Sequence, residues 1–83
     1  MIVKLIGTES ALDPATGSDI GSATVVRVMN SSGTAQKVTV KDGDNTVGEV
    51  TLAAGEALHL QKTATHTLLA NSSVKAVKVA HAN

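Results

Sequence analysis

Short segments of alternating apolar and polar residues, separated by turn residues, run through most of this chain. Val38 and Val40 alternate with polar residues in one such segment, and Leu58 and Leu60 do so in another. Because successive side chains of an extended chain point to opposite faces, this period of two predicts β-strands. The expected strands cover residues 1–6, 22–30, 36–42, 46–52, 56–62, 65–70 and 74–81.

The segments between the expected strands carry residues that favour turns. Residues 42–45 (Asp-Gly-Asp-Asn) are a strong signal for a tight hairpin, and Gly48 in the next strand is typical of a bulge. Residues 7–21 form the longest connection and contain an Asp-Pro pair. No segment has the apolar period of an amphipathic helix, and only residues 63–71 could hold a helical turn.

Strands spaced by roughly 8–12 residues are typical of small all-β folds. The abundant Val and Thr fit this class, because β-branched residues pack well on a pleated surface. We therefore predict one all-β domain over residues 1–83, a sandwich or small barrel of six to seven short, mainly antiparallel strands. Residues 7–21 are its long connecting loop.

Two expected strands are apolar on both faces. In residues 22–30, Val25 and Met29 fall on one face while Val26 and Val28 fall on the other, and residues 1–6 behave alike. Such a strand is either central in its own fold or covered by a partner, and both alternatives stay open. The residues expected to contact another subunit are Met1, Ile2, Val3, Leu5, Val25 and Met29.

The composition limits the stability that this domain reaches on its own. The chain contains no Phe, Tyr, Trp or Cys, and most of its hydrophobic residues are Ala and Val. An aromatic side chain buries about 150–250 Å², so a core without one is thin. Disulfides are excluded as a further source of stability. Oligomerisation or docking on a larger assembly remains, since binding of a partner stabilises the folded state.

Charge and hydropathy exclude several classes of partner. The formal net charge is +0, and the basic residues are scattered, so no stripe for a nucleic-acid backbone is expected. No apolar run approaches the roughly 20 residues of a membrane-spanning helix. Residues 1–6 lack the features of a signal peptide, and we therefore expect synthesis in the cytoplasm.

Candidate metal ligands are few and far apart in the sequence. Zinc sites usually contain a closely spaced pair of ligands, whereas His59, His66 and His81 are widely separated and are interpreted as surface residues. Residues 42–45 offer oxygen ligands for Ca²⁺, but the spacing of an EF-hand is absent and a hairpin requires the same residue types. We predict no metal site and no cofactor.

Motifs for catalysis are also lacking. The chain has neither a Gly-x-Ser-x-Gly elbow nor a Gly-rich phosphate loop before a helix. Glu49 and Glu56 are interpreted as charges that keep a strand edge soluble. Asn30-Ser31-Ser32 and Asn71-Ser72-Ser73 match the glycosylation sequon, and both are interpreted as turns. We predict no catalytic residue and no enzymatic activity.

Most of the chain resembles a known group of proteins in length and layout. The similarity covers residues 1–6, residues 21–30, residues 47–56, in which Ala-Ala-Gly-Glu separates two strands, and residues 74–81. On these segments the chain is similar to small virion proteins of tailed bacteriophages, those of marine cyanophages in particular. The resemblance implies a compact β-domain present in many copies on the virion, and it favours a capsid decoration (cement) protein.

The expected function is that of a structural virion protein that binds the outer surface of a phage capsid and stabilises the shell. The expected partners are the major capsid protein and sister subunits in cyclic clusters such as trimers, with no nucleic acid and no membrane. The expected location is the capsid surface. Two alternatives stay open: a tail or baseplate subunit, and a free β-module that binds carbohydrate or Ca²⁺. The missing aromatic residues argue against carbohydrate.

Overall fold

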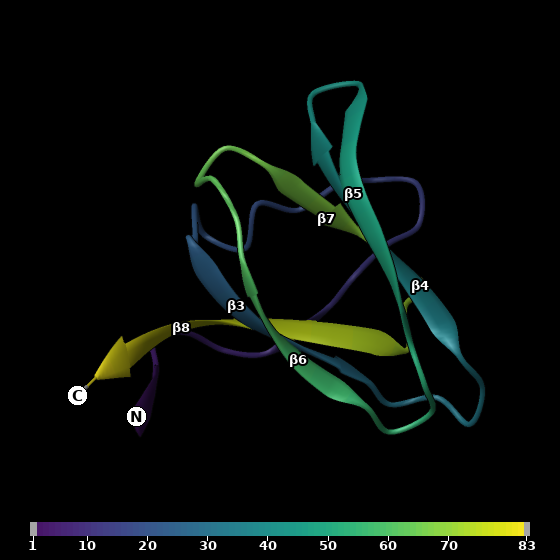
Figure 1. The fold of residues 1–83 in the computed structure, drawn as a ribbon, viewed down its shortest axis with the longest axis horizontal. Helices are drawn as coiled ribbons and strands as arrows, with labels where there is room; N and C mark the ends of the chain where they lie inside the picture. The colour runs from purple at the N-terminus through teal and green to yellow at the C-terminus, as the bar shows by residue number, and fades with distance from the viewer. Residues whose placement is uncertain (1, 83) are drawn as a thin grey trace.

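Residues 2–82 fold into eight short strands in two antiparallel sheets. Figure 1 shows how the longer strands are arranged. The computed structural model describes the backbone of residues 2–82 and the side chains of residues 4–80, and this part contains no helix. The strands are β1 (Ile2–Leu5), β2 (Ser10–Ala11), β3 (Val25–Asn30), β4 (Gln36–Asp42), β5 (Asn45–Leu52), β6 (Ala57–Gln61), β7 (Thr67–Leu69) and β8 (Val74–Ala82). The predicted all-β class is confirmed.

The first sheet is organised around β8, the longest strand. Its order is β1-β8-β3-β6, and β2 pairs with β8 beside β1. The second sheet has the order β5-β4-β7. One edge of β5 and one edge of β6 therefore have no neighbouring strand among the described residues.

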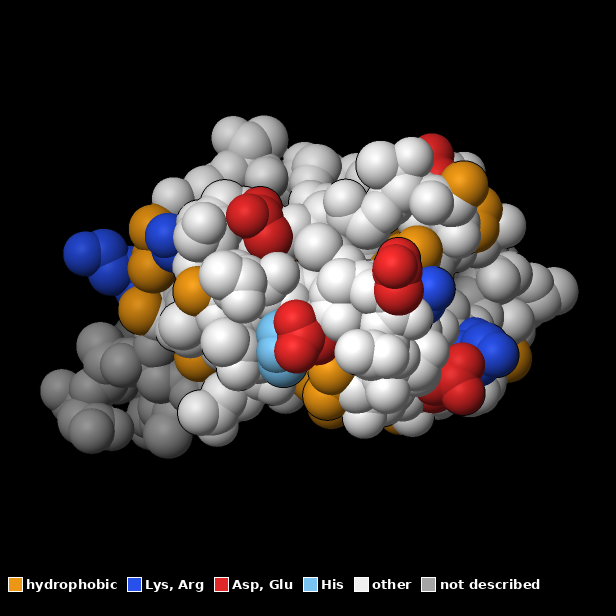
Figure 2. Space-filling model, turned by 90° about the horizontal axis from the view of Figure 1, so that it is seen from above, with side chains coloured by type: hydrophobic (Ala, Val, Ile, Leu, Met, Phe, Trp, Pro, Cys, Tyr) orange, Lys and Arg blue, Asp and Glu red, His pale blue; other side chains and the backbone are white. Residues whose placement is uncertain are grey.

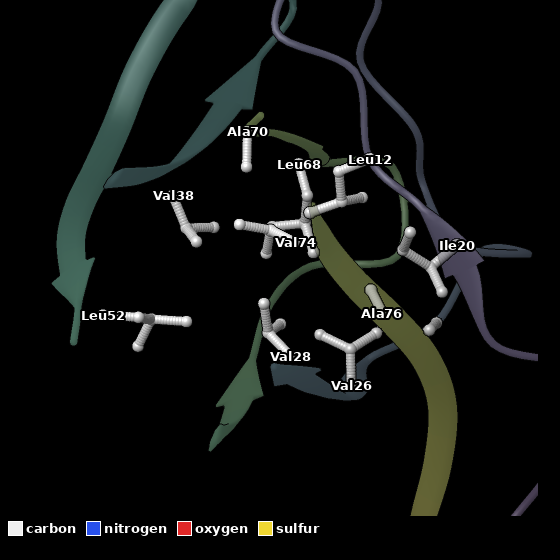
Figure 3. Packing of buried hydrophobic residues seen from close by; sticks show 11 residues of the cluster. Leu12, Ile20, Val26, Val28, Val38, Leu52, Leu68, Ala70, Val74 and Ala76 are labelled. Atoms are coloured by element: carbon white, nitrogen blue, oxygen red, sulfur yellow. The ribbon is translucent and has the colours of Figure 1, made fainter. Parts of the chain in front are cut away.

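The core lies between the two sheets and consists of small aliphatic side chains. Burial alternates along β3, where Val26 and Val28 point into the core. Figure 3 shows Val38 and Leu52 of the second sheet on the opposite side of this cluster. Burying a side chain of this kind stabilises the fold by about 1.5–3 kcal/mol before conformational entropy is counted.

The prediction of a simple connecting loop over residues 7–21 is incomplete. This segment contains β2, and Ser18 forms a bridge with Leu68 of β7. Leu12 and Ile20 are both buried in the core cluster and anchor the segment to it. Isolated apolar residues between polar ones have no periodicity, so the sequence pattern gives no signal for these contacts.

Residues 20–22 form a left-handed turn within this segment. The φ angles of Ile20, Gly21 and Ser22 are 53°, 65° and 58°, and the N–H of Ala23 donates to the carbonyl of Asp19 over 3.2 Å. A left-handed conformation costs a non-glycine residue roughly 1–2 kcal/mol. The burial of Ile20, whose exposed fraction is 8%, offsets this strain.

Residues 63–71 contain β7 rather than a helical turn. The N–H of His66 donates to the carbonyl of Thr63 over 2.9 Å, which closes a tight turn, and β7 then pairs with β4. The strand predicted at residues 65–70 is confirmed. Its central residue, Leu68, is fully buried against the core, and this burial favours the strand over a helical turn.

The predicted hairpin between β4 and β5 is confirmed. Gly43 has a φ angle of 61° at the first position of a two-residue loop, the conformation for which glycine is favoured there. The pairing register shifts between Val40 and Lys41, so that β5 has one extra residue, Val47, directly before Gly48. The predicted bulge at Gly48 is therefore also confirmed.

Asn30, at the end of β3, is a buried polar residue that joins the two sheets. Its Nδ2 donates to the carbonyls of Thr34, Leu52 and Ala53 over 2.8, 3.0 and 3.2 Å. Its Oδ1 accepts hydrogen bonds from the backbone N–H and the hydroxyl of Ser32. A buried amide is costly unless it is hydrogen-bonded, and these partners meet that requirement.

Asn71 begins a second Asn-Ser-Ser turn with the same local contacts. Its Oδ1 accepts from the N–H and the hydroxyl of Ser73 over 3.0 and 2.9 Å, yet its side chain is exposed. The two turns touch, because Ser31 donates from both its N–H and its hydroxyl to the carbonyl of Ser73. Both segments contain turns, as predicted from the sequence.

Candidate binding surfaces

His59 and His66, the histidines whose side chains the structure describes, belong to no common metal site. His66 is mostly buried and its Nε2 lies 3.8 Å from Oδ2 of Asp42. His59 lies opposite Arg27 in the β3–β6 register, and the side chain of His81 lies outside the described residues. Within the described part of the chain, no three His, Cys, Asp or Glu residues gather where they could hold a metal ion.

Of the predicted interface residues, Leu5, Val25 and Met29 lie on the outer face of the five-stranded sheet, the side turned away from the core. Val25 and Met29 lie there half-buried, because Val26 and Val28 between them face inward. Leu5, in β1, has an exposed fraction of 67% and pairs with Val79 of β8. Met1 and the side chains of Ile2 and Val3 lie outside the described residues.

The outer face also contains two valines that the sequence did not single out as contact residues. Val77 and Val79 alternate with Ala76, and it is Ala76 that lies in the core cluster. Val77 pairs with Arg27, whose Nη1 lies 3.7 Å from Oε2 of Glu9. The long charged side chain of Arg27 thus lies beside Val77, which is only 4% exposed.

A groove of about 500 Å³ opens between β5 and β6, on the side of the molecule where neither strand has a further neighbour. Its apolar lining comes from both sheets: Val38, Val40, Val47, Val50 and Leu60. Val50 shares its register position with buried Val38 and was correctly predicted to face inward, yet it remains 39% exposed. It is exposed because it lines this open groove.

Lys62 lines the end of this groove and is buried, with an exposed fraction of 7%. Its Nζ donates to the carbonyls of Thr63 and Ala64 over 3.3 and 3.4 Å. Burial lowers the pKa of Lys62, because desolvation disfavours the charged form, and the negative charge of Asp19 partly opposes this shift.

Sequence reasoning missed Lys62, although a signal was present. Lys62 follows Leu58 and Leu60 at the same alternating position, so the strand pattern places a cation on the core-facing side. A charged residue at an inward position breaks the binary pattern of a strand, and such exceptions often mark binding sites. The groove itself could not be anticipated, since its lining comes from strands of both sheets.

Charge is mixed on the face of the molecule that Figure 2 shows. On the face shown in Figure 2, acidic and basic side chains are interspersed and hydrophobic side chains form small separate groups. Among the described residues there is no helix long and apolar enough to cross a membrane.

No protein-family model, curated protein or solved structure matches this chain.

Proposed function

We propose that this chain is a structural virion protein that binds the outer surface of a phage capsid as a decoration protein. The observation that supports the proposal best is the outer face of the five-stranded sheet. Leu5 is two-thirds exposed there, and Val25 and Met29 lie half-buried on the same face, across β8 from Leu5. Aliphatic side chains that a sheet face leaves exposed gain free energy when a partner removes them from water.

The energetics of the domain support the same proposal. The core contains only Leu, Ile, Val and Ala side chains, so the isolated domain gains little stability beyond the few kcal/mol usual for its size. A partner that binds the folded form adds its binding free energy to that stability. On a repeating lattice, weak contacts of many copies also add up through multivalency.

The amino-terminal strand offers a second mode of contact. β1 pairs with β8 on one side and is the edge strand of its sheet on the other, so its outer backbone groups can extend a neighbouring sheet. Leu5 and Ile6 next to this edge are 67% and 47% exposed. We propose that this strand and the outer face together form the contact with capsid and sister subunits.

A map of the virion that contains this chain tests the proposal directly. We expect density for the domain on the outside of the head, with the outer face of the five-stranded sheet against the shell or a sister subunit. Density in the tail or baseplate would support the alternative structural role. Absence from the particle would contradict both.

A binding assay tests the surface itself. Leu5→Glu should reduce co-sedimentation with capsids that lack the protein, because it buries a charge in the proposed contact. Thr8→Glu is the matched control, since Thr8 is exposed and lies just beyond β1. Deletion of residues 1–6 should reduce binding as well. Unchanged binding and assembly of both Leu5→Glu and the deletion would exclude this surface.

A further inference from the structure

The walls of the groove between β5 and β6 are two strand edges with unpaired backbone groups. β5 is the terminal strand of the order β5-β4-β7, and β6 is the terminal strand of the order β1-β8-β3-β6. An edge strand presents a row of N–H and C=O groups that can pair with another extended chain. Here two such edges border the same opening, and the Ala53–Gly55 turn connects them at one end.

The floor of the groove is apolar and matches the side-chain period of a strand. Val38, Val50 and Leu60 contribute side chains from both sheets. The bulge places Val47 and Gly48 together opposite Val40, and this brings Val47 to the lining of the groove. An extended segment lying between β5 and β6 would point every second side chain onto this floor.

Lys62 determines which charge a ligand of this groove is expected to carry. It is a buried cation, and among the described residues no carboxylate lies within ion-pair distance of its Nζ. Its Nζ has three N–H donors, and two carbonyls accept from it. Asp19 only partly offsets the cost of burying this charge, so a carboxylate at this end of the groove would compensate it further, which a neutral occupant would not.

We propose that this groove binds an extended peptide segment of a partner protein, with apolar residues at alternate positions and an acidic residue that faces Lys62. The backbone edges distinguish a peptide from an aliphatic carboxylate. An acyl chain fills an apolar floor but offers nothing to the N–H and C=O groups of β5 and β6, whereas a strand pairs with them. The groove is separate from the outer face of the first sheet, so the proposal holds or fails independently of the virion role.

The test uses synthetic peptides with a tryptophan at one end. The protein has no aromatic residue, so tryptophan fluorescence reports the peptide alone. Each peptide has three inward positions separated by Thr. Two positions carry Val and either the first or the last carries Glu, because the direction of the bound strand is not assumed. Each has a partner with Gln in place of Glu, and a scrambled peptide lacks the alternation.

We expect one Glu peptide to bind about five-fold or more tightly than its Gln partner, because charge-assisted hydrogen bonds are roughly twice as strong as neutral ones. Lys62→Met should abolish that difference. Val50→Glu should abolish binding, whereas Thr51→Glu, on the opposite face of the same strand, should preserve it. Circular dichroism of each variant verifies that it is folded.

Four results would overturn the proposal. The first is no fluorescence change up to about millimolar peptide, a concentration at which even weak association is detected, and the second is equal binding of the Glu, Gln and scrambled peptides. The third is peptide binding that survives Val50→Glu in the folded protein, and the fourth is binding of decanoate without binding of any peptide. Virion mapping depends on none of these results, so failure here is distinguishable from failure of the proposed function.

Discussion

Replacing Asn30 with Ala should strongly destabilise the domain, while the same change at Asn71 should have a small effect. Both residues begin an Asn-Ser-Ser turn, and in both the Oδ1 accepts from the N–H and hydroxyl of the serine two residues on. Of the two, Asn30 is the buried one, and besides the carbonyl of nearby Thr34 its amide donates to the distant carbonyls of Leu52 and Ala53. The difference between the two variants therefore isolates the tertiary hydrogen bonds from the local turn.

The magnitude follows from the number of bonds that are lost. The two N–H groups of Asn30 are shared among three carbonyls, and each hydrogen bond contributes a net of about 1 kcal/mol. Leaving the buried carbonyl of Leu52 without its partner adds about 1 kcal/mol or more. We expect Asn30→Ala to cost about 3 kcal/mol and Asn71→Ala to cost about 1 kcal/mol or less.

Urea and thermal unfolding followed by far-UV circular dichroism measure both changes. For a domain of this size, about 3 kcal/mol lowers Tm by roughly 12–24 °C. Asn30→Asp and Asn71→Asp give a second comparison, because Asp keeps the acceptor oxygen of the turn but loses the amide donors. We expect Asn30→Asp to be at least as destabilising as Asn30→Ala, and Asn71→Asp to be nearly neutral. If both Asn30 variants were no less stable than their Asn71 counterparts, the reasoning would be refuted.

Three further changes should have measurable effects. Gly17→Ala should lower the free energy of unfolding by about 1–3 kcal/mol, because a Cβ there would lie 2.6 Å from Oγ1 of Thr67. Gly33→Ala is the control, because a Cβ there would meet nothing within 4 Å. Equal urea midpoints of the two variants would contradict this prediction. Two backbone N–H groups donate to Asp13 and lower its pKa below 3.8 in the folded state. The contribution of this carboxylate to the free energy of unfolding is therefore present above pH 3.8 and is lost as pH falls through the folded pKa. Asp13→Asn should weaken the pH dependence of the urea midpoint between about pH 4 and pH 2, and an unchanged pH dependence would exclude Asp13 as its source. The pKa of Lys62 in the folded state is lowered from 10.5, so the unfolded chain binds more protons between the folded pKa and 10.5, and stability should rise with pH in that window. Lys62→Met should remove this rise and raise the urea midpoint at pH 7. A lower urea midpoint would show that the hydrogen bonds of Nζ to the two carbonyls stabilise the fold more than desolvation of the charge destabilises it.

The thin core and the exposed aliphatic residues make contact with a partner energetically favourable for this protein. Leu52, Leu68 and several valines are the largest fully buried apolar side chains, and Leu5 and Val47 remain largely exposed. A chain that leaves aliphatic residues in water beside free strand edges gains free energy from association. This property supports a role in assemblies whichever of the two surfaces binds the partner.

Local pattern was sufficient to predict most of the strands. Alternation placed Val26 and Val28 on one face and Val25 and Met29 on the other, and this division is confirmed. The hairpin at Gly43 and the bulge at Gly48 were also predictable, because they follow from local backbone preferences. That predicted contact residues lie on the outer face could be recognised only in the structure, because the sequence does not show which face of a strand is covered. The structure describes no side chain before residue 4.

What the sequence alone determined is therefore the period of each strand, the turns between them and the small aliphatic character of the core. It could not determine which face of a strand is covered, because burial depends on what packs above it. Ala76 lies in the core, while Val77 beside it faces outward next to Arg27. Asn30 and Asn71 begin identical tripeptides, and only the approach of β5 makes one of them a buried link between sheets. Tertiary structure also decided the groove, since its lining comes from strands of both sheets.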